Sequence, residues 1–387
     1  MICKYILYFS YSNIHMTMKN NKIALLISTL SLSMIMTSCS DSLSDTTDGR
    51  LRYWISTLAS DDFEGRAPGT EGGQLTKNFI SQTFQDLDLD SIDGNYFLDV
   101  PTSEITLKDS SYLTLSFRGN DRKMINGKEV VFWTKQARDY RKIRDSEVVF
   151  VGYGIVAPEY NWNDYEGIDV TGKTVVILVN DPGFATGKLR LFNGRSMTYY
   201  GRWTYKFEEA ARQGAAAAII VHEEEPAAYP WSVVENSWQG PQLDLQRDDL
   251  GADRVTLEGW IRDESLNDVL NFTGFDYDGL KQIALEKTFS AFPLRGLTLS
   301  SEIHNKVRYL QSHNIAAIKK GNVRPDEYIL FMAHWDHLGM MELTEPGQDI
   351  IVNGAVDNAT GVASVLEFAK RFSEVETDRS IMFLAVT

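Results

Sequence analysis

Apolar residues recur at helical spacing in two segments that lie on either side of a turn-rich loop. Four of them share one face of a predicted helix over residues 50–58: Leu51, Trp54, Ile55 and Leu58. A second amphipathic pattern predicts a helix over residues 74–87. Residues 60–73 between them are rich in Gly, with Asp, Ser and one Pro, so we expect this loop to lack regular structure.

The pattern changes between about residue 105 and residue 293, where short apolar runs alternate with turn residues. Such runs are typical of β-strands. We expect strands at residues 148–154, 174–179 and 215–221, and a helix at residues 206–213.

After about Ser312 the pattern is that of an α/β fold. The expected strands are at residues 314–319, 328–333 and 380–386, and the expected helix is at residues 360–372. Strands this apolar are typical of a parallel sheet that is buried on both faces. The roughly 75 residues after Ser312 are too few to complete such a sheet, so we expect the sequence to be truncated at its C-terminus.

The N-terminal segment predicts export. A short basic stretch at residues 18–22 precedes an apolar run at residues 23–36, which is shorter than the about 20 residues of a membrane-spanning helix. We therefore expect a signal peptide over residues 1–38, with Met16 or Met18 as an alternative start. The ending Met36-Thr37-Ser38-Cys39 resembles a bacterial lipobox. This resemblance implies lipidation of Cys39, a tether at residues 39–48 and a lipid anchor in the cell envelope.

Composition narrows the classes of function. A length of 387 residues suits two domains. The chain has 38 Lys and Arg against 53 Asp and Glu, a net charge of −15, which disfavours non-specific binding to nucleic acid. Its two cysteines, Cys3 and Cys39, cannot build a disulfide framework or a Cys-rich zinc site. A metal site would therefore use His, Asp and Glu.

His334 and Asp336 follow the predicted strand at residues 328–333. In open α/β sheets, ligands bind at the carboxyl ends of the strands. A carboxylate beside a metal-binding imidazole can also hold its second nitrogen. On its own, however, a His-x-Asp pattern is more typical of an ordinary surface histidine.

Asp357 lies just before the helix predicted at residues 360–372. The N-terminus of a helix favours an anion, so Asp357 fits a binding site there. It equally fits a simple helix cap, and by itself this second interpretation is favoured. The residues able to cap the helix are Asp357, Asn358 and Thr360.

Taken together, these motifs resemble metallopeptidase family 28, which comprises co-catalytic zinc aminopeptidases and carboxypeptidases. The resemblance is carried by residues 334–339 (His-Trp-Asp-His-Leu-Gly) and residues 354–361 (Gly-Ala-Val-Asp-Asn-Ala-Thr-Gly). Residues 58–72 are similar to the opening pattern of the family, L-x-S-D-x-x-x-G-R-x-x-G-T-x-G. Three further segments resemble strands of a protease-associated domain: residues 151–154, 172–179 and 214–221.

The resemblance implies an α/β fold with two parts. Residues 49–104 and 298–387 would form an incomplete zinc-aminopeptidase-like (phosphorylase/hydrolase-like) sheet with helices. Residues 105–297 would form a mostly β protease-associated domain inserted into it.

The resemblance also implies a site for two zinc ions. His334 would bind one zinc, Asp357 would bridge both, and Asp336 would be the catalytic residue that orients His334. The peptide bond between Asp357 and Asn358 would be cis. A Glu-Glu pair, an Asp and a His of the family pattern would follow Thr387, so the 387 residues alone should be inactive as a peptidase.

Three weaker candidates for a substrate pocket remain. The resemblance gives His337 no role as a metal ligand, so we place it in the pocket wall together with Asn358. Residues 199–206 are aromatic and basic, and Arg202 could reach a substrate carboxylate. Packing of these aromatic residues against one another is the favoured alternative.

The sequence therefore predicts an exported zinc exopeptidase. By resemblance, a water molecule shared by two zinc ions would hydrolyse peptides at a free N-terminal amine. Two alternatives remain open: a non-catalytic lipoprotein that binds peptides or proteins, and a glutaminyl cyclase-like enzyme, which shares the fold with one zinc.

Overall fold

The computed structural model describes residues 46–238, 240–341 and 346–387. The chain divides into two units with a boundary after Tyr53, and the second unit is Trp54–Thr387. The predicted signal peptide, the predicted lipidation at Cys39 and most of the tether lie outside the described residues. In the described part of the chain, none of the helices has the length and apolar character that crossing a membrane requires.

Both helices predicted near residue 50 are confirmed, as α2 (Thr47–Leu58) and α3 (Glu71–Asp86). The expectation that residues 60–73 lack regular structure is wrong. A short 3₁₀ helix, η1 (Asp61–Arg66), occupies the first half of this loop, and Glu64 and Gly65 in it adopt left-handed φ angles of 47° and 65°. These two residues let the chain turn sharply within a helical segment.

The segment between residues 105 and 297 mixes strands and helices, so it is not mostly β as expected. Its strands, with the first residues of β1, are β1 (Phe97–Leu107), β2 (Tyr112–Phe117), β3 (Asn120–Lys123), β4 (Val130–Trp133), β5 (Tyr140–Phe150), β6 (Val156–Ala157), β7 (Trp162–Asn163), β8 (Thr174–Leu178), β9 (Ala217–His222), β10 (Pro241–Leu245) and β11 (Leu257–Arg262). Its helices are η2 (Pro158–Tyr160), α4 (Pro182–Thr186), η3 (Tyr199–Gly201), α5 (Trp203–Arg212), α6 (Glu224–Ala227), α7 (Trp231–Trp238), α8 (Asp263–Leu270) and α9 (Tyr277–Ile283). The strand predicted at residues 148–154 ends early, since Gly152 and Gly154 have positive φ angles of 57° and 61°.

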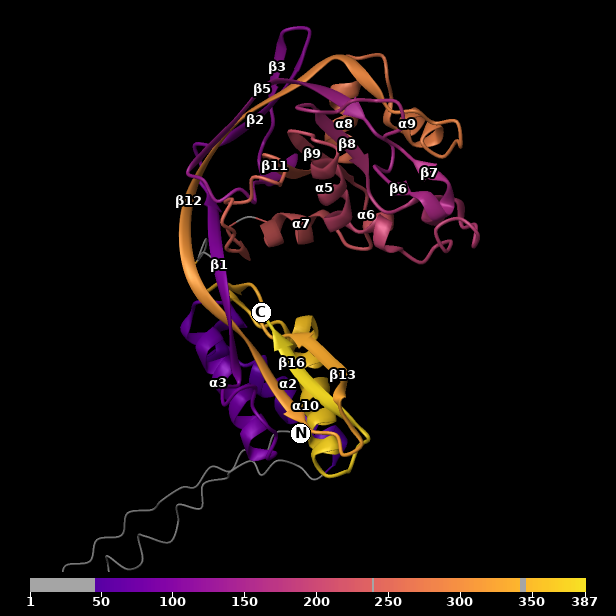
Figure 1. The fold of residues 1–387 in the computed structure, drawn as a ribbon. Coiled ribbons are helices and arrows are strands. Elements are labelled where there is room, and N and C mark those ends of the chain that lie inside the picture. Colours follow the sequence, from indigo (N-terminus) through magenta and orange to yellow (C-terminus); the bar gives the residue numbers. More distant parts are fainter. Residues whose placement is uncertain (1–45, 239, 342–345) are drawn as a thin grey trace, which may run out of the picture. The chain divides into compact units, whose positions relative to one another are not determined.

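One strand, β12 (Phe292–Lys319), runs for 28 residues and contains the strand predicted at residues 314–319. It pairs antiparallel with β1, β2 and β5 (Figure 1). In the described residues these strands belong to one mixed sheet of 12 strands, whose main path is β10-β1-β12-β5-β8-β9-β11-β4. Since β1 and β12 run across residues 104 and 297, the expected domain boundaries stay a prediction.

The C-terminal elements confirm the α/β pattern. Strand β13 (Arg324–His334) is parallel to β16 (Arg379–Val386), and β16 is antiparallel to β12. The sheet is therefore mixed rather than parallel. Helix α10 (Thr360–Ser373) packs on β13, where the rings of Phe368 and Phe331 stack with centroids 4.5 Å apart.

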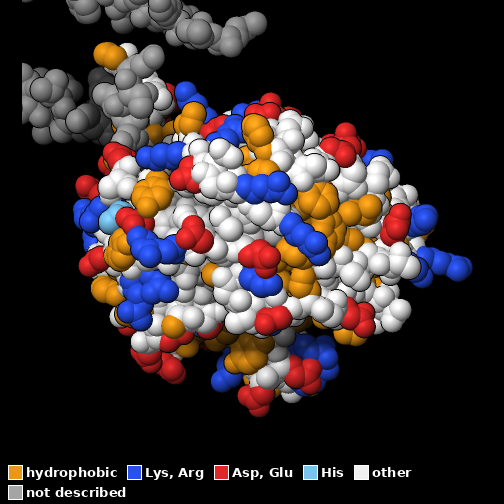
Figure 2. Space-filling model, turned by 90° about the horizontal axis from the view of Figure 1, so that it is seen from above, with side chains coloured by type: hydrophobic (Ala, Val, Ile, Leu, Met, Phe, Trp, Pro, Cys, Tyr) orange, Lys and Arg blue, Asp and Glu red, His pale blue; other side chains and the backbone are white. Residues whose placement is uncertain are grey.

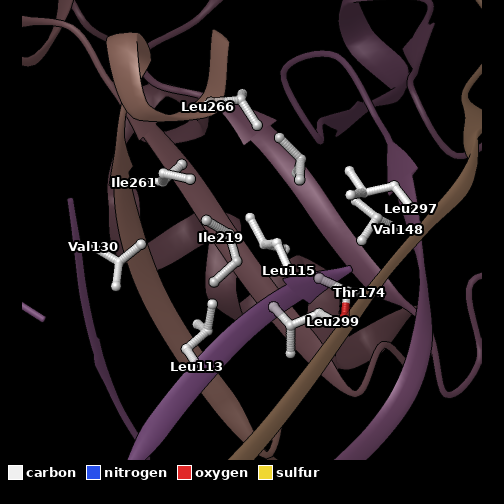
Figure 3. A pocket seen from close by; sticks show the side chains of 11 residues that line it. Leu113, Leu115, Val130, Val148, Thr174, Ile219, Ile261, Leu266, Leu297 and Leu299 are labelled. Carbon is white, nitrogen blue, oxygen red and sulfur yellow. The ribbon is translucent and has the colours of Figure 1, made fainter. Parts of the chain in front are cut away.

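The apolar core of the middle segment contains a small void of about 10 Å³ (Figure 3). Its walls are aliphatic apart from Thr174, whose hydroxyl donates to Ser146 Oγ at 3.0 Å. An apolar void that barely fits one water molecule stays dry. We interpret it as imperfect packing rather than a ligand site.

Charged side chains are mixed on the face shown in Figure 2. Lys and Arg lie among Asp and Glu there, and apolar side chains lie between them. This face therefore presents no continuous basic patch of the kind that binds nucleic acid.

Candidate metal centre

His334 ends strand β13, and both nitrogens of its ring have a partner. Nδ1 lies 3.1 Å from the backbone oxygen of Asp336 and 3.5 Å from Asp336 Oδ1. Nε2 lies 3.0 Å from Asp357 Oδ1. The interaction with the Asp336 side chain, helped by the charge of Asp357, raises the pKa of His334 against the opposing effect of burial. Asp336 thus holds one nitrogen while the other faces Asp357.

Asp357 lies in a short π-helical turn, η4 (Ala355–Ala359), that leads into α10. Its peptide bond with Asn358 is cis, which confirms the prediction made from the sequence. It is Asn358 and not Asp357 that binds the first turn of α10, since its Oδ1 accepts a hydrogen bond from the amide of Gly361 at 3.1 Å. The carboxylate of Asp357 is largely exposed and faces His334 instead.

A small hairpin explains how these distant residues meet. Strands β14 (Gly339–Met340) and β15 (Ile351–Val352) pair antiparallel, so the chain returns toward the end of β13 before it enters η4. His334 and Asp357 consequently lie on the two segments that leave the open end of this hairpin side by side.

Arg66 is a central residue of this region that the sequence analysis did not single out. Its side chain is fully buried. Its guanidinium donates to four backbone carbonyls: Trp335 at 3.0 Å, Leu58 at 2.6 Å, Asn353 at 2.6 Å and Gly354 at 2.8 Å. The only sequence signal for Arg66 was the Gly-Arg pair in the opening motif. Its acceptors are backbone carbonyls, which every residue type has, so the sequence does not identify them.

Two of the three weaker candidates lie near the centre. His337 is half-buried; burial lowers its pKa, and the charge of Asp357 opposes this effect. The side-chain oxygen of Asn358 is already used by Gly361, so its place in a substrate pocket stays a prediction.

Arg202 precedes α5 and is exposed. Among the described residues, no hydrogen bond or ion pair links it with His334 or Asp357. The aromatic rings beside it pack on one another, with centroids of Tyr199 and Tyr200 at 5.3 Å and 5.1 Å from that of Tyr205. This is the packing alternative of the sequence analysis, and a substrate role for Arg202 stays a prediction.

The paired donors fit the chemistry of zinc. Zinc binds imidazole nitrogen and carboxylate oxygen, and His334 Nε2 and Asp357 Oδ1 supply one of each. Within residues 46–238, 240–341 and 346–387, however, no group of three or more His, Cys, Asp or Glu side chains is placed to hold a metal ion. Among the described residues, one imidazole nitrogen and one carboxylate oxygen therefore face each other without a third donor of these kinds placed to bind the same ion.

His222, in β9, is a buried histidine, and its burial predicts a pH effect on stability. Burial lowers its pKa, an effect that the Tyr229 carbonyl and Asp263 oppose and Arg262 assists. Because the unfolded chain binds the proton more readily, the stabilisation is complete above about pH 6.5 and is lost as the pH falls through the lowered pKa. We expect the melting temperature of His222→Gln to depend less on pH between about 7.5 and 5 than that of the unaltered protein. If calorimetry shows the same dependence of melting temperature on pH for His222→Gln and the unaltered protein, the effect does not come from His222.

Comparisons with known proteins point to the same segment. The sequence model of Peptidase family M28 matches residues 314–387. A search of curated proteins gave no match.

Several solved structures are similar to the chain. An aminopeptidase from Aneurinibacillus sp. strain AM-1 is 19% identical, with 88% of this chain and 62% of that chain covered and a TM-score of 0.43. BSAP, a zinc aminopeptidase from Bacillus subtilis, is 19% identical, with 89% and 61% covered and a TM-score of 0.37. A Peptidase M28 precursor from Shewanella amazonensis SB2B is 16% identical, with 88% and 67% covered and a TM-score of 0.39.

The chain thus spans about three fifths of the length of the first two of these structures, 62% and 61%. The match to the family model, rather than these likenesses, bears on the metal centre. Residues 314–387, which carry His334, Asp336 and Asp357, match Peptidase family M28 in sequence.

Proposed function

We propose that the protein is a zinc-dependent peptidase of family M28 that removes residues from the N-terminus of peptides. The observation that carries the proposal is the 3.0 Å approach of His334 Nε2 to Asp357 Oδ1, in a segment that matches the family. These two residues would hold zinc, as ligand of one ion and as bridge between two.

The chain's own residues prepare this site for metal. Asp336 engages Nδ1 of His334 and so leaves Nε2 directed at Asp357. A carboxylate in this position fixes the orientation of a metal-binding imidazole. When bound, zinc lowers the pKa of water and polarises a carbonyl group, the two effects that peptide hydrolysis needs.

The 387 residues by themselves should nevertheless be inactive. Within the described residues we assign two zinc ligands and no general base, and loss of a general base alone costs about 10²–10⁴-fold in rate. The test is the release of p-nitroaniline from aminoacyl p-nitroanilides, with and without a chelator. We expect no release by the 387 residues, and chelator-sensitive release by a chain that also supplies the missing zinc ligands and the general base.

A non-catalytic binding protein is the second candidate. It is favoured by the lack of a third zinc ligand among the described residues. The same assay separates the two, because a binding protein would stay inactive with every residue of its reading frame present. Chelator-sensitive release by the 387 residues alone would contradict both the inactivity prediction and this second candidate.

We further propose that the protein is exported and anchored to a bacterial membrane through lipidated Cys39. The support is the basic stretch, apolar run and Cys39 at the N-terminus. Two or more acyl chains hold a protein firmly on a membrane, whereas one does not. Cys39→Ala should abolish labelling by radioactive palmitate and release the protein from the membrane fraction. Unchanged labelling would refute the proposal.

A further inference from the structure

We infer that residues 58–66 form a bracket that fixes both loops carrying the proposed zinc ligands, and that Arg66 is its positioning residue. We call residues 334–337 the first ligand loop and residues 353–357 the second. The role in zinc binding rests on the proposed function, whereas the fixing of the loops does not.

The guanidinium of Arg66 is shared by both ligand loops. It donates to Trp335 of the first loop at 3.0 Å, and to Asn353 and Gly354 of the second at 2.6 Å and 2.8 Å. A fourth bond, to Leu58 at 2.6 Å, ties the same group to the bracket itself. Because the guanidinium is planar and rigid, it fixes the distance between the two loops.

Each loop has a second tether to the bracket. Asn353 of the second loop donates from Nδ2 to Ala59 O at 3.0 Å and to Asp61 Oδ1 at 2.9 Å. The amide of His337 in the first loop donates to Arg66 O at 3.3 Å. Two attachments on each loop restrict rotation as well as translation.

The chain is tightly packed around the bracket, without room for one additional side-chain atom at Gly65 or Gly354. A Cβ added to Gly65 would clash with the carbonyls of Gly339 and Val352, which belong to the hairpin that joins the two loops. A Cβ added to Gly354 would clash with the Arg66 guanidinium and the His337 ring. The hairpin and both ligand loops therefore rest directly on the bracket.

The positive charge of Arg66 and its hydrogen bonds to the loops predict opposite effects of its replacement on the affinity for a metal ion. The cation lies near Asp336 and Asp357, so its removal would make the site more negative and should favour a divalent metal ion. If Arg66 fixes the loops, its removal should weaken metal binding instead, by the about 10–100-fold that is typical of residues supporting metal ligands. Arg66→Lys separates these effects because it keeps the charge and loses the planar fork.

The probe is Co²⁺, followed through the ring signals of the six histidines by NMR. We expect Arg66→Lys and Arg66→Met both to raise the Co²⁺ concentration at half-shift of the His334 signal by about tenfold or more. The matched control is Phe84→Leu, which weakens buried packing against Phe383 but leaves every hydrogen bond named above in place. Its midpoint should stay within about twofold of the unaltered protein.

Amide hydrogen exchange provides a readout without metal. Both Arg66 variants should exchange faster in residues 335–339 and 353–361, and Phe84→Leu should not. Should Arg66→Met fail to fold, Asn353→Ala, which cuts one tether, should still speed exchange in the second loop.

Metal binding by His334 and fixing of the loops by Arg66 are tested separately. If Co²⁺ does not shift His334 in the unaltered protein, the proposed function fails and hydrogen exchange still decides whether the bracket exists. Unchanged exchange and midpoints in Arg66→Lys and Asn353→Ala would overturn the bracket and leave the proposed function standing. If the Co²⁺ midpoint is lower than in the unaltered protein for Arg66→Met but not for Arg66→Lys, Arg66 acts through its charge.

Discussion

The Trp335→Ala substitution is expected to lower the free energy of unfolding by about 3–5 kcal/mol, the range for removing a large buried aromatic side chain. Trp335 is 1% exposed and lies between His334 and Asp336 in the first ligand loop. Its indole donates to His313 O at 3.0 Å, and its own carbonyl accepts from Arg66. The measurement is urea denaturation followed by circular dichroism, which does not depend on the tryptophan removed.

The matched variant is Trp335→Phe, which keeps most of the ring packing and loses the indole donor. It should cost about 1–3 kcal/mol, because His313 O is left without this partner. A loss below about 1 kcal/mol for Trp335→Ala would show that the loop does not depend on this anchor.

Self-association through strand β13 is the second large effect that we expect. Among the described residues, β13 pairs with β16 on one edge only. Four of its apolar residues are about half exposed: Tyr328 at 53%, Ile329 at 46%, Leu330 at 48% and Met332 at 57%. An apolar strand with a free edge pairs readily with other chains, so the 387 residues should form oligomers as their concentration rises.

Light scattering after gel filtration tests this expectation. Ile329→Lys together with Met332→Lys should restore a monomer, because charge on an edge strand opposes pairing. Leu189→Lys, at a position that is 80% exposed outside β13, is the control and should leave the oligomers unchanged. A monomer at all concentrations in the unaltered chain would contradict the prediction.

Periodic apolar patterns identified most elements that position the site. Helix α10 and strand β16 follow their predicted spans to within two residues, since both bury a regular apolar face. Strand β12 was recognised only at its end, because polar residues such as His304 and Lys306 interrupt the pattern along its 28 residues. Helix η1 was missed because it depends on left-handed backbone conformations at Glu64 and Gly65, which no sequence pattern indicated.

The candidate site was predictable where it uses side chains and unpredictable where it uses backbone. His334, Asp336 and Asp357 were singled out from motifs, and the structure brings all three together. Arg66 was quoted in a motif without a role, since all four of its acceptors are carbonyls. Any residue type can offer a carbonyl, so such contacts emerge only from the fold.

Above all, we propose that His334 and Asp357 bind the same metal ion. The most direct measurement is Co²⁺ titration of the histidine ring signals in the unaltered protein, in Asp357→Asn and in Asp326→Asn, an exposed aspartate on β13. We predict that His334 shifts before the other five histidines and that Asp357→Asn, unlike Asp326→Asn, raises the midpoint by about tenfold or more. A His334 signal that does not respond, or equal midpoints in Asp357→Asn and the unaltered protein, would contradict the claim.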